Sequence, residues 1–249
     1  KPTLAAITAA RSLGMSMIRR GERSNAVKWF TWMQSAEIDS QSAPLLAESA
    51  ICLGRYAQKD RDYPTAAGWY AKARKLSQGT GDREHALEAA MEEVGMVLEL
   101  AGRGKGSYEE SALYAAQVLS DYSDQTALQT YATTRLMRIE SLWNAGLYSE
   151  AQKEAAVLAS EPKWKREALA AGYWQAESLM SLKKWDEAAA VFDELSRAEI
   201  GSQDCFPSLN VKTLSQEKGV KAWTLAGNQT KASELEAMLD AQIESTEEK

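Results

Sequence analysis

The stretch that decides the fold runs from Leu53 to Leu76 and reads LGRYAQKDRDYPTAAGWYAKARKL. Its apolar residues recur at steps of three and four, which is the spacing of the buried stripe of an α-helix. The polar run around Asp60 interrupts this spacing, so the pattern predicts one helix over 45–59 and a second over 63–76, folded into a hairpin. Ala66 is small enough for the two backbones to approach closely, and the ring of Tyr63 closes the turn end of the pair.

The hairpin recurs along the whole chain. A small residue stands early in each second helix, at spacings of 40, 45, 40, 37 and 44 residues, and these residues are Ala26, Ala66, Ser111, Ala151, Ala188 and Ala232. An aromatic residue precedes it by three positions in four units, as Tyr63, Tyr108, Tyr148 and Trp185. The spacing predicts an all-α chain of six helix pairs, in units over 4–38, 45–77, 83–120, 125–160, 163–198 and 207–243, forming one domain over 1–249.

Composition agrees with a helical chain and excludes several functions. The 249 residues include 29 basic and 35 acidic side chains, with only 5 prolines and 15 glycines. A net charge of −6 without a long basic run argues against nucleic-acid binding, which needs clustered cations. No apolar stretch approaches the roughly 18 residues that a membrane-spanning helix needs.

The quoted stretch resembles the tetratricopeptide repeat (TPR) family, whose units carry Leu-Gly in the first helix and Ala-x3-Phe in the second. The best copy is Leu53-Gly54 followed by Ala66-x3-Tyr70, and the first unit has Leu13-Gly14 followed by Ala26-x3-Phe30. Later units match more loosely, the leading tryptophan of the family is absent, and the spacing exceeds the 34 residues of the family. The resemblance implies a right-handed α–α superhelix that holds a peptide or helix of a protein partner in a concave groove, without catalysis.

Residues 173–179 and 185–188 also resemble repeats of bacterial envelope lipoproteins and periplasmic coordinator proteins. This likeness would place the chain in the periplasm or cell envelope as part of a larger assembly, with the cytoplasm as the alternative. The two cysteines, Cys52 and Cys205, fit either compartment and are not expected to pair, because units of a solenoid contact only their neighbours.

The groove positions of the family predict the binding residues of this chain. They are Arg11, Met15, Arg19, Arg55, Lys59, Glu92, Met96, Glu99, Glu140, Trp143, Tyr173, Glu177 and Met180. We expect the aromatic residues Trp143 and Tyr173 to anchor the partner, and the glutamates at 140 and 177 to select a basic, apolar segment. The alternative is a solvated surface above core methionines, because exposed charges on a helix commonly serve only solubility.

A second hypothesis is a small-ligand or glycan-binding superhelix, with Trp143, Trp164 and Trp174 as the stacking residues. A clamp for acidic C-terminal tails, known in other members of the family, is not expected, because only one cation occurs at its positions, which hold Arg11, Met15, Cys52, Ala89 and Glu93. Enzymatic activity, a metal and a cofactor are not expected either. The single histidine, His85, cannot build a zinc site, and the glycine-rich run 102–107 lacks the order of a phosphate-binding loop.

Overall fold

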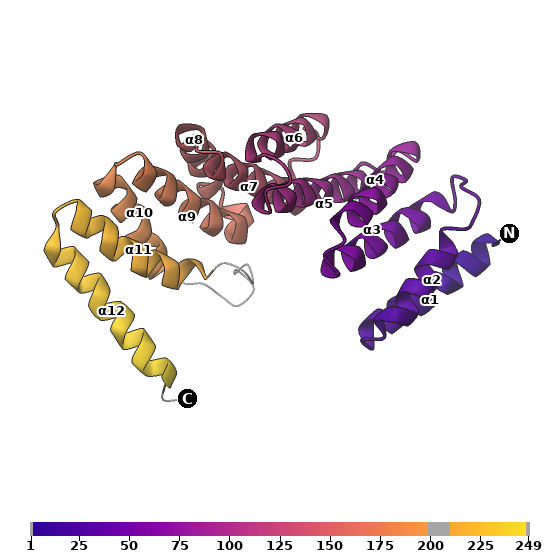
Figure 1. Ribbon diagram of the computed structural model, residues 1–249, viewed down its shortest axis with the longest axis horizontal. Coiled ribbons are helices and arrows are strands. Elements are labelled where there is room, and N and C mark those ends of the chain that lie inside the picture. The colour runs from indigo at the N-terminus through magenta and orange to yellow at the C-terminus, as the bar shows by residue number, and fades with distance from the viewer. Residues whose placement is uncertain (1, 199–209, 248–249) are drawn as a thin grey trace. The chain divides into compact units, whose positions relative to one another are not determined.

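The structure is a computed structural model that describes residues 2–198 and 210–247, and side chains up to 240. Within these ranges the chain forms helices and no strands (Figure 1), which confirms the all-α prediction. The α-helices are α1 (Leu4–Arg19), α2 (Arg23–Met33), α3 (Ala43–Lys59), α4 (Tyr63–Gly79), α5 (Arg83–Gly102), α6 (Tyr108–Asp121), α7 (Gln129–Asn144), α8 (Tyr148–Ala159), α9 (Lys165–Ser181), α10 (Trp185–Arg197), α11 (Val211–Leu225) and α12 (Gln229–Glu247), and a short 3-10 helix, η1, spans Pro162–Trp164.

Most turns within the hairpins have the same backbone conformation. Five hairpins join their helices through three residues, and the middle residue of each link has a positive φ angle. Glycine occupies three of these positions, but Arg61 (φ 62°) and Lys183 (φ 61°) occupy the other two at a steric cost of roughly 1 kcal/mol. The link between α5 and α6 is longer, and Ser107 ends it with a capping box in which its side chain and that of Glu110 bond each other's backbone N–H.

In three of the helix pairs, a glycine of the first helix lies directly against a large side chain of the second helix. Gly14 lies against the ring of Phe30, Gly54 against the ring of Tyr70, and Gly219 against Leu235. Each contact joins residues sixteen positions apart, and the three larger residues are almost fully buried. A glycine in the first helix therefore makes room for a bulky residue of the second helix.

The chain contains two compact units, Lys1–Thr134 and Arg135–Lys249, whose boundary lies inside α7. The first unit has a core around Phe30, Met33 and Leu46 that continues into one around Tyr70 and Met96. The core of the second unit is built from residues that α9, α10, α11 and α12 contribute, among them Leu179, Phe192, Trp223 and Leu235. The predicted single domain over 1–249 stays a prediction, and the predicted start of the sixth unit at 207 lies outside the described residues.

Within residues 2–198 and 210–247, no helix is both long enough and apolar enough to cross a membrane.

Candidate partner-binding face

The first helices of the N-terminal unit share a ladder of ion pairs. Arg11 of α1 binds Glu48 of α3 through Nε and Nη2, at 2.5 and 2.8 Å. Arg55 of α3 binds Glu92 of α5 at 2.8 Å and Glu88 at 2.9 Å. Each arginine thus joins its helix to the next first helix, and we call the surface that carries these pairs the α1–α3–α5 face.

Two adjoining depressions lie on the α1–α3–α5 face. The larger, of about 540 Å³, is lined by Met15 and Ile18 of α1 and by Cys52, Tyr56 and Lys59 of α3, with Glu92 at its edge. The smaller, of about 370 Å³, lies over the Arg11–Glu48 pair and extends to His85. Both depressions include Met15, Cys52 and Arg55, so they form one continuous hollow with an apolar floor between charged rims.

Cys52 contributes a neutral group to that floor. Burial, and then the neighbouring Glu48 carboxylate, raise the pKa of its thiol to about 11. A thiolate is therefore scarce at neutral pH, so Cys52 acts here as a small apolar side chain.

The hollow is lined by five of the predicted groove residues, which are Arg11, Met15, Arg55, Lys59 and Glu92. Arg19 is exposed in the last turn of α1. Met96 is only 1% exposed and belongs to the core, so its side chain is not available to a partner. Glu99 accepts hydrogen bonds from Arg103 and from the hydroxyl of Tyr63, which occupy its carboxylate.

The predicted anchors of the second unit pack against their own neighbours. Tyr173 is 7% exposed, and its ring lies 6.0 Å from that of Phe192, so it is a core residue rather than an exposed anchor. Trp143 is half-buried with its ring centroid 5.1 Å from that of Trp174, and its indole N–H is buried without a hydrogen-bond partner. Of the residues of the glycan hypothesis, Trp143 and Trp174 are therefore half-buried against each other, and Trp174 also contacts Tyr173.

The remaining residues of this predicted site are also engaged or partly covered. Glu177 is almost buried and lies 3.0 Å from the ammonium of Lys218, so its charge is already balanced. Glu140 is half-buried on α7, and Met180 packs against the core of the second unit. Trp164 carries the ammonium of Lys163 at 4.5 Å from its ring centroid.

Comparison with solved structures identifies the fold. The chain is similar to BtubC (BKLC) from P. vanneervenii, with a TM-score of 0.65 and 14% identity over 99% of this chain and 93% of that one. It is also similar to the TPR-like repeats of a kinesin light chain-like protein from Podosopora anserina, with a TM-score of 0.58 and 15% identity over 80% and 95% of the two chains. This chain has a TPR-like repeat fold.

A third TPR-like neighbour is a Rap protein in complex with Competence and Sporulation Factor, with a TM-score of 0.52 and 13% identity over 96% of this chain and 75% of that one. No protein-family model and no curated protein matches the sequence. The expected TPR-like architecture is therefore confirmed, whereas these comparisons lend no support to the likeness to bacterial envelope proteins.

Two positions of the tail-binding clamp, Ala89 and Glu93, lie on α5. Ala89 is fully buried, and Glu93 is almost buried, with Arg74 bound to both of its carboxylate oxygens and Tyr114 donating to one of them at 2.5 Å. Arg74, Glu93 and Tyr114 thus join α4, α5 and α6, so the two clamp positions on α5 contribute to packing.

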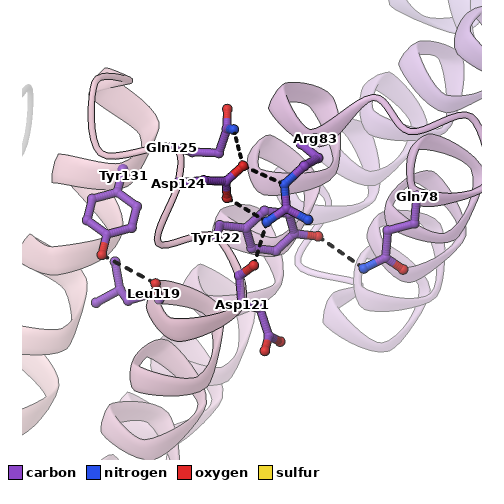
Figure 2. A network of polar contacts seen from close by, with 8 residues as sticks. All are labelled: Gln78, Arg83, Leu119, Asp121, Tyr122, Asp124, Gln125 and Tyr131. Carbon is purple, nitrogen blue, oxygen red and sulfur yellow. Dashed lines mark hydrogen bonds and ion pairs between the residues drawn. The ribbon is translucent and has the colours of Figure 1, made fainter.

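A polar network that the sequence does not reveal fixes the connection between α6 and α7. Figure 2 shows that Arg83, at the start of α5, donates hydrogen bonds to both carboxylate oxygens of Asp124 and to the backbone carbonyl of Asp121. The guanidinium also lies 5.0 Å from the ring of Tyr122, whose hydroxyl accepts a hydrogen bond from Gln78. The partners are up to 44 residues apart, and no repeat position or motif marks them.

The structure also bears on metal binding by the described residues. No group of three or more histidine, cysteine or acidic side chains in these ranges has the arrangement of a metal site. His85 is exposed on the first turn of α5, and its Nδ1 lies 2.7 Å from the carboxylate of Asp82, the N-cap residue of the same helix.

Proposed function

We propose that this protein is a non-catalytic interaction module that holds a segment of a protein partner on the α1–α3–α5 face. The observation that carries the proposal is the continuous hollow over Met15, Cys52 and Arg55, which combines two depressions on neighbouring first helices. A hollow that spans neighbouring first helices and combines apolar with charged side chains suits an extended or helical peptide.

The floor offers a site for one large apolar side chain of the partner. Ile18 is 36% exposed at the edge of the larger depression, and Met15 is a flexible side chain that can adapt to different shapes. Burial of such a partner side chain is the main source of affinity that this surface can supply.

The charges of the rim bear on the sign of the partner's charge. The carboxylates of Glu48, Glu88 and Glu92 all hold arginines of this chain, so a basic partner would have to displace Arg11 or Arg55. The expectation of a basic partner segment therefore loses support. Apolar contact is the part of the proposal that we retain.

The comparison with the Rap protein supports a binding role, because that TPR-like structure holds a bound factor.

Selection from a phage-displayed library of random dodecapeptides tests the proposal on the full chain. Peptides should be enriched, and their affinity should fall at least about tenfold in a Met15→Glu/Ile18→Ser variant, because the charge and the polar residue disrupt the apolar floor. A matched control is Leu113→Ser, which removes an apolar residue that is 71% exposed on α6. Affinity that is insensitive to the α1 substitutions, or equally sensitive to the control, would refute the proposed face.

A further inference from the structure

A separate depression of about 530 Å³ lies between the connection from α2 to α3 and the C-terminal half of α4. We call it the α4 depression and define it by Ile38, Asp39, Ala43, Lys72, Lys75 and Leu76. Leu76 and Ala43 are buried at its base, whereas Ile38 is 62% exposed at its edge. None of these residues lines the α1–α3–α5 face, so the two surfaces can be tested independently.

The two lysines of the α4 depression carry charges that no carboxylate of the described residues balances. Within the described part of the chain, no carboxylate forms an ion pair with Lys72 or Lys75. The arginines of the same unit behave differently, since Arg11, Arg55, Arg74 and others hold carboxylates. Lys72 is half-buried, and its ammonium lies 5.5 Å from the ring centroid of Trp69. A partly buried cation without a carboxylate gains when a partner supplies one.

The single acidic side chain of the depression is turned to its own loop. One carboxylate oxygen of Asp39 accepts hydrogen bonds from the backbone N–H groups of Gln41 at 2.9 Å and Ser42 at 2.7 Å. These bonds hold one oxygen of Asp39 against its own loop, and the two lysines outnumber this single carboxylate, so the lining of the depression has a net positive charge.

We propose that the α4 depression binds an acidic, apolar segment of a protein partner. One large apolar side chain of the segment contacts Ile38 and Leu76, and flanking carboxylates bind Lys72 and Lys75. Charge complementarity selects this occupant, because a basic segment would meet two unpaired lysines.

The test uses the full chain and three fluorescein-labelled hexapeptides, with binding followed by fluorescence anisotropy. The peptides are Glu-Asp-Leu-Phe-Asp-Glu, its basic counterpart Lys-Lys-Leu-Phe-Lys-Lys, and Glu-Asp-Ser-Ser-Asp-Glu, which lacks the apolar residues. The first should saturate the protein at a dissociation constant below about 1 mM, and the other two should bind at least about tenfold more weakly.

Variants locate the binding on the surface. Lys72→Glu/Lys75→Glu should weaken binding of the acidic, apolar peptide at least about tenfold, and Ile38→Ser about fivefold. The control Lys28→Glu/Lys153→Glu changes the net charge equally at two exposed lysines outside the depression. Circular dichroism of each variant checks that helicity is unchanged.

Four results would overturn this proposal. They are the absence of saturable binding, equal binding of the basic peptide, an equal loss in the charge-matched control, and a loss of binding in the Met15→Glu/Ile18→Ser variant. The last result would assign the peptide to the α1–α3–α5 face.

Discussion

Substitution of Gly54 by alanine tests the close approach of α3 and α4. A Cβ atom at this position would lie 2.6 Å from Cε1 of Tyr70, 2.8 Å from Cδ1 and 2.9 Å from Cζ. The ring has no free space to move into, because Tyr70 is fully buried and its hydroxyl donates to Gln58 at 2.9 Å. Overpacking of this kind costs about 1–3 kcal/mol.

A second glycine separates this cost from helix propensity. Replacing glycine by alanine inside a helix stabilises it by about 1 kcal/mol. Gly68 lies on α4, is exposed, and has nothing within 4 Å of the position of an added Cβ. We therefore expect Gly68→Ala to raise the free energy of unfolding by about 1 kcal/mol. The free energy of unfolding of Gly54→Ala should be about 2 kcal/mol lower than that of Gly68→Ala.

Urea unfolding followed by circular dichroism at 222 nm measures both variants on the full chain. If the added methyl group of Gly54→Ala presses on the ring of Tyr70, then Tyr70→Leu should lower the free energy of unfolding less in the Gly54→Ala background than in the wild type. We expect a coupling energy on the order of 1 kcal/mol. The reasoning would be refuted if Gly54→Ala were as stable as Gly68→Ala.

Three further predictions follow from the turns, the polar network and the floor of the binding face. Lys183→Gly should stabilise the protein by about 0.5 kcal/mol in urea unfolding, because it relieves a positive φ angle, whereas Lys153→Gly within α8 should destabilise it by about 1 kcal/mol. Hydrogen bonds from Arg83, then from Gln125, lower the pKa of Asp124 from 3.8 to about 2, so their stabilising effect is present above pH 4 and is lost as the pH falls toward 2. Carboxyl NMR titration should give that value and a return to the ordinary range in Arg83→Gln, and an unchanged value in this variant would contradict the assignment. In a Cys205→Ser background, alkylation of Cys52 by iodoacetamide should be roughly one hundredfold slower at pH 8 than alkylation of a free cysteine. The rate should increase until the pH reaches about 11, whereas a plateau near pH 9 would show that the thiol is not buried.

The helix pairs could be predicted from the sequence because their signals are local. Helical spacing, the polar break after Lys59 and the small residue at 66 are all set within a few turns of chain, and the structure gives α3 and α4 with nearly those ends. The turns themselves were less predictable. Arg61 and Lys183 stand where glycine would be expected, so the sequence carries no sign of the positive φ angle there.

The binding face could be predicted only in part, because exposure depends on the rotation of each helix about its axis. Met15, Arg55 and Lys59 lie where the repeat places them, whereas Met96, one turn from Glu92, is turned into the core. Pairing across helices was not predictable either, since the partner of Arg55 depends on how α5 lies beside α3. The same holds for the α4 depression, whose two sides are separated by at least 29 residues, from Ala43 to Lys72.

The sixteen-residue contact also bears on how such chains diverge. Gly14, Gly54 and Gly219 leave room for a ring or a leucine, and at the same spacing of sixteen residues Ala176 precedes Phe192 and Ile139 precedes Ala155, all four of them fully buried. Bulk can thus change sides between the two helices, and the shared quantity is the combined volume of two residues. A description that scores each position alone counts such an exchange as two mismatches, although the gap remains filled. Many residue combinations can fill such a gap, and the solved structures that share this architecture are only 13–15% identical to this chain.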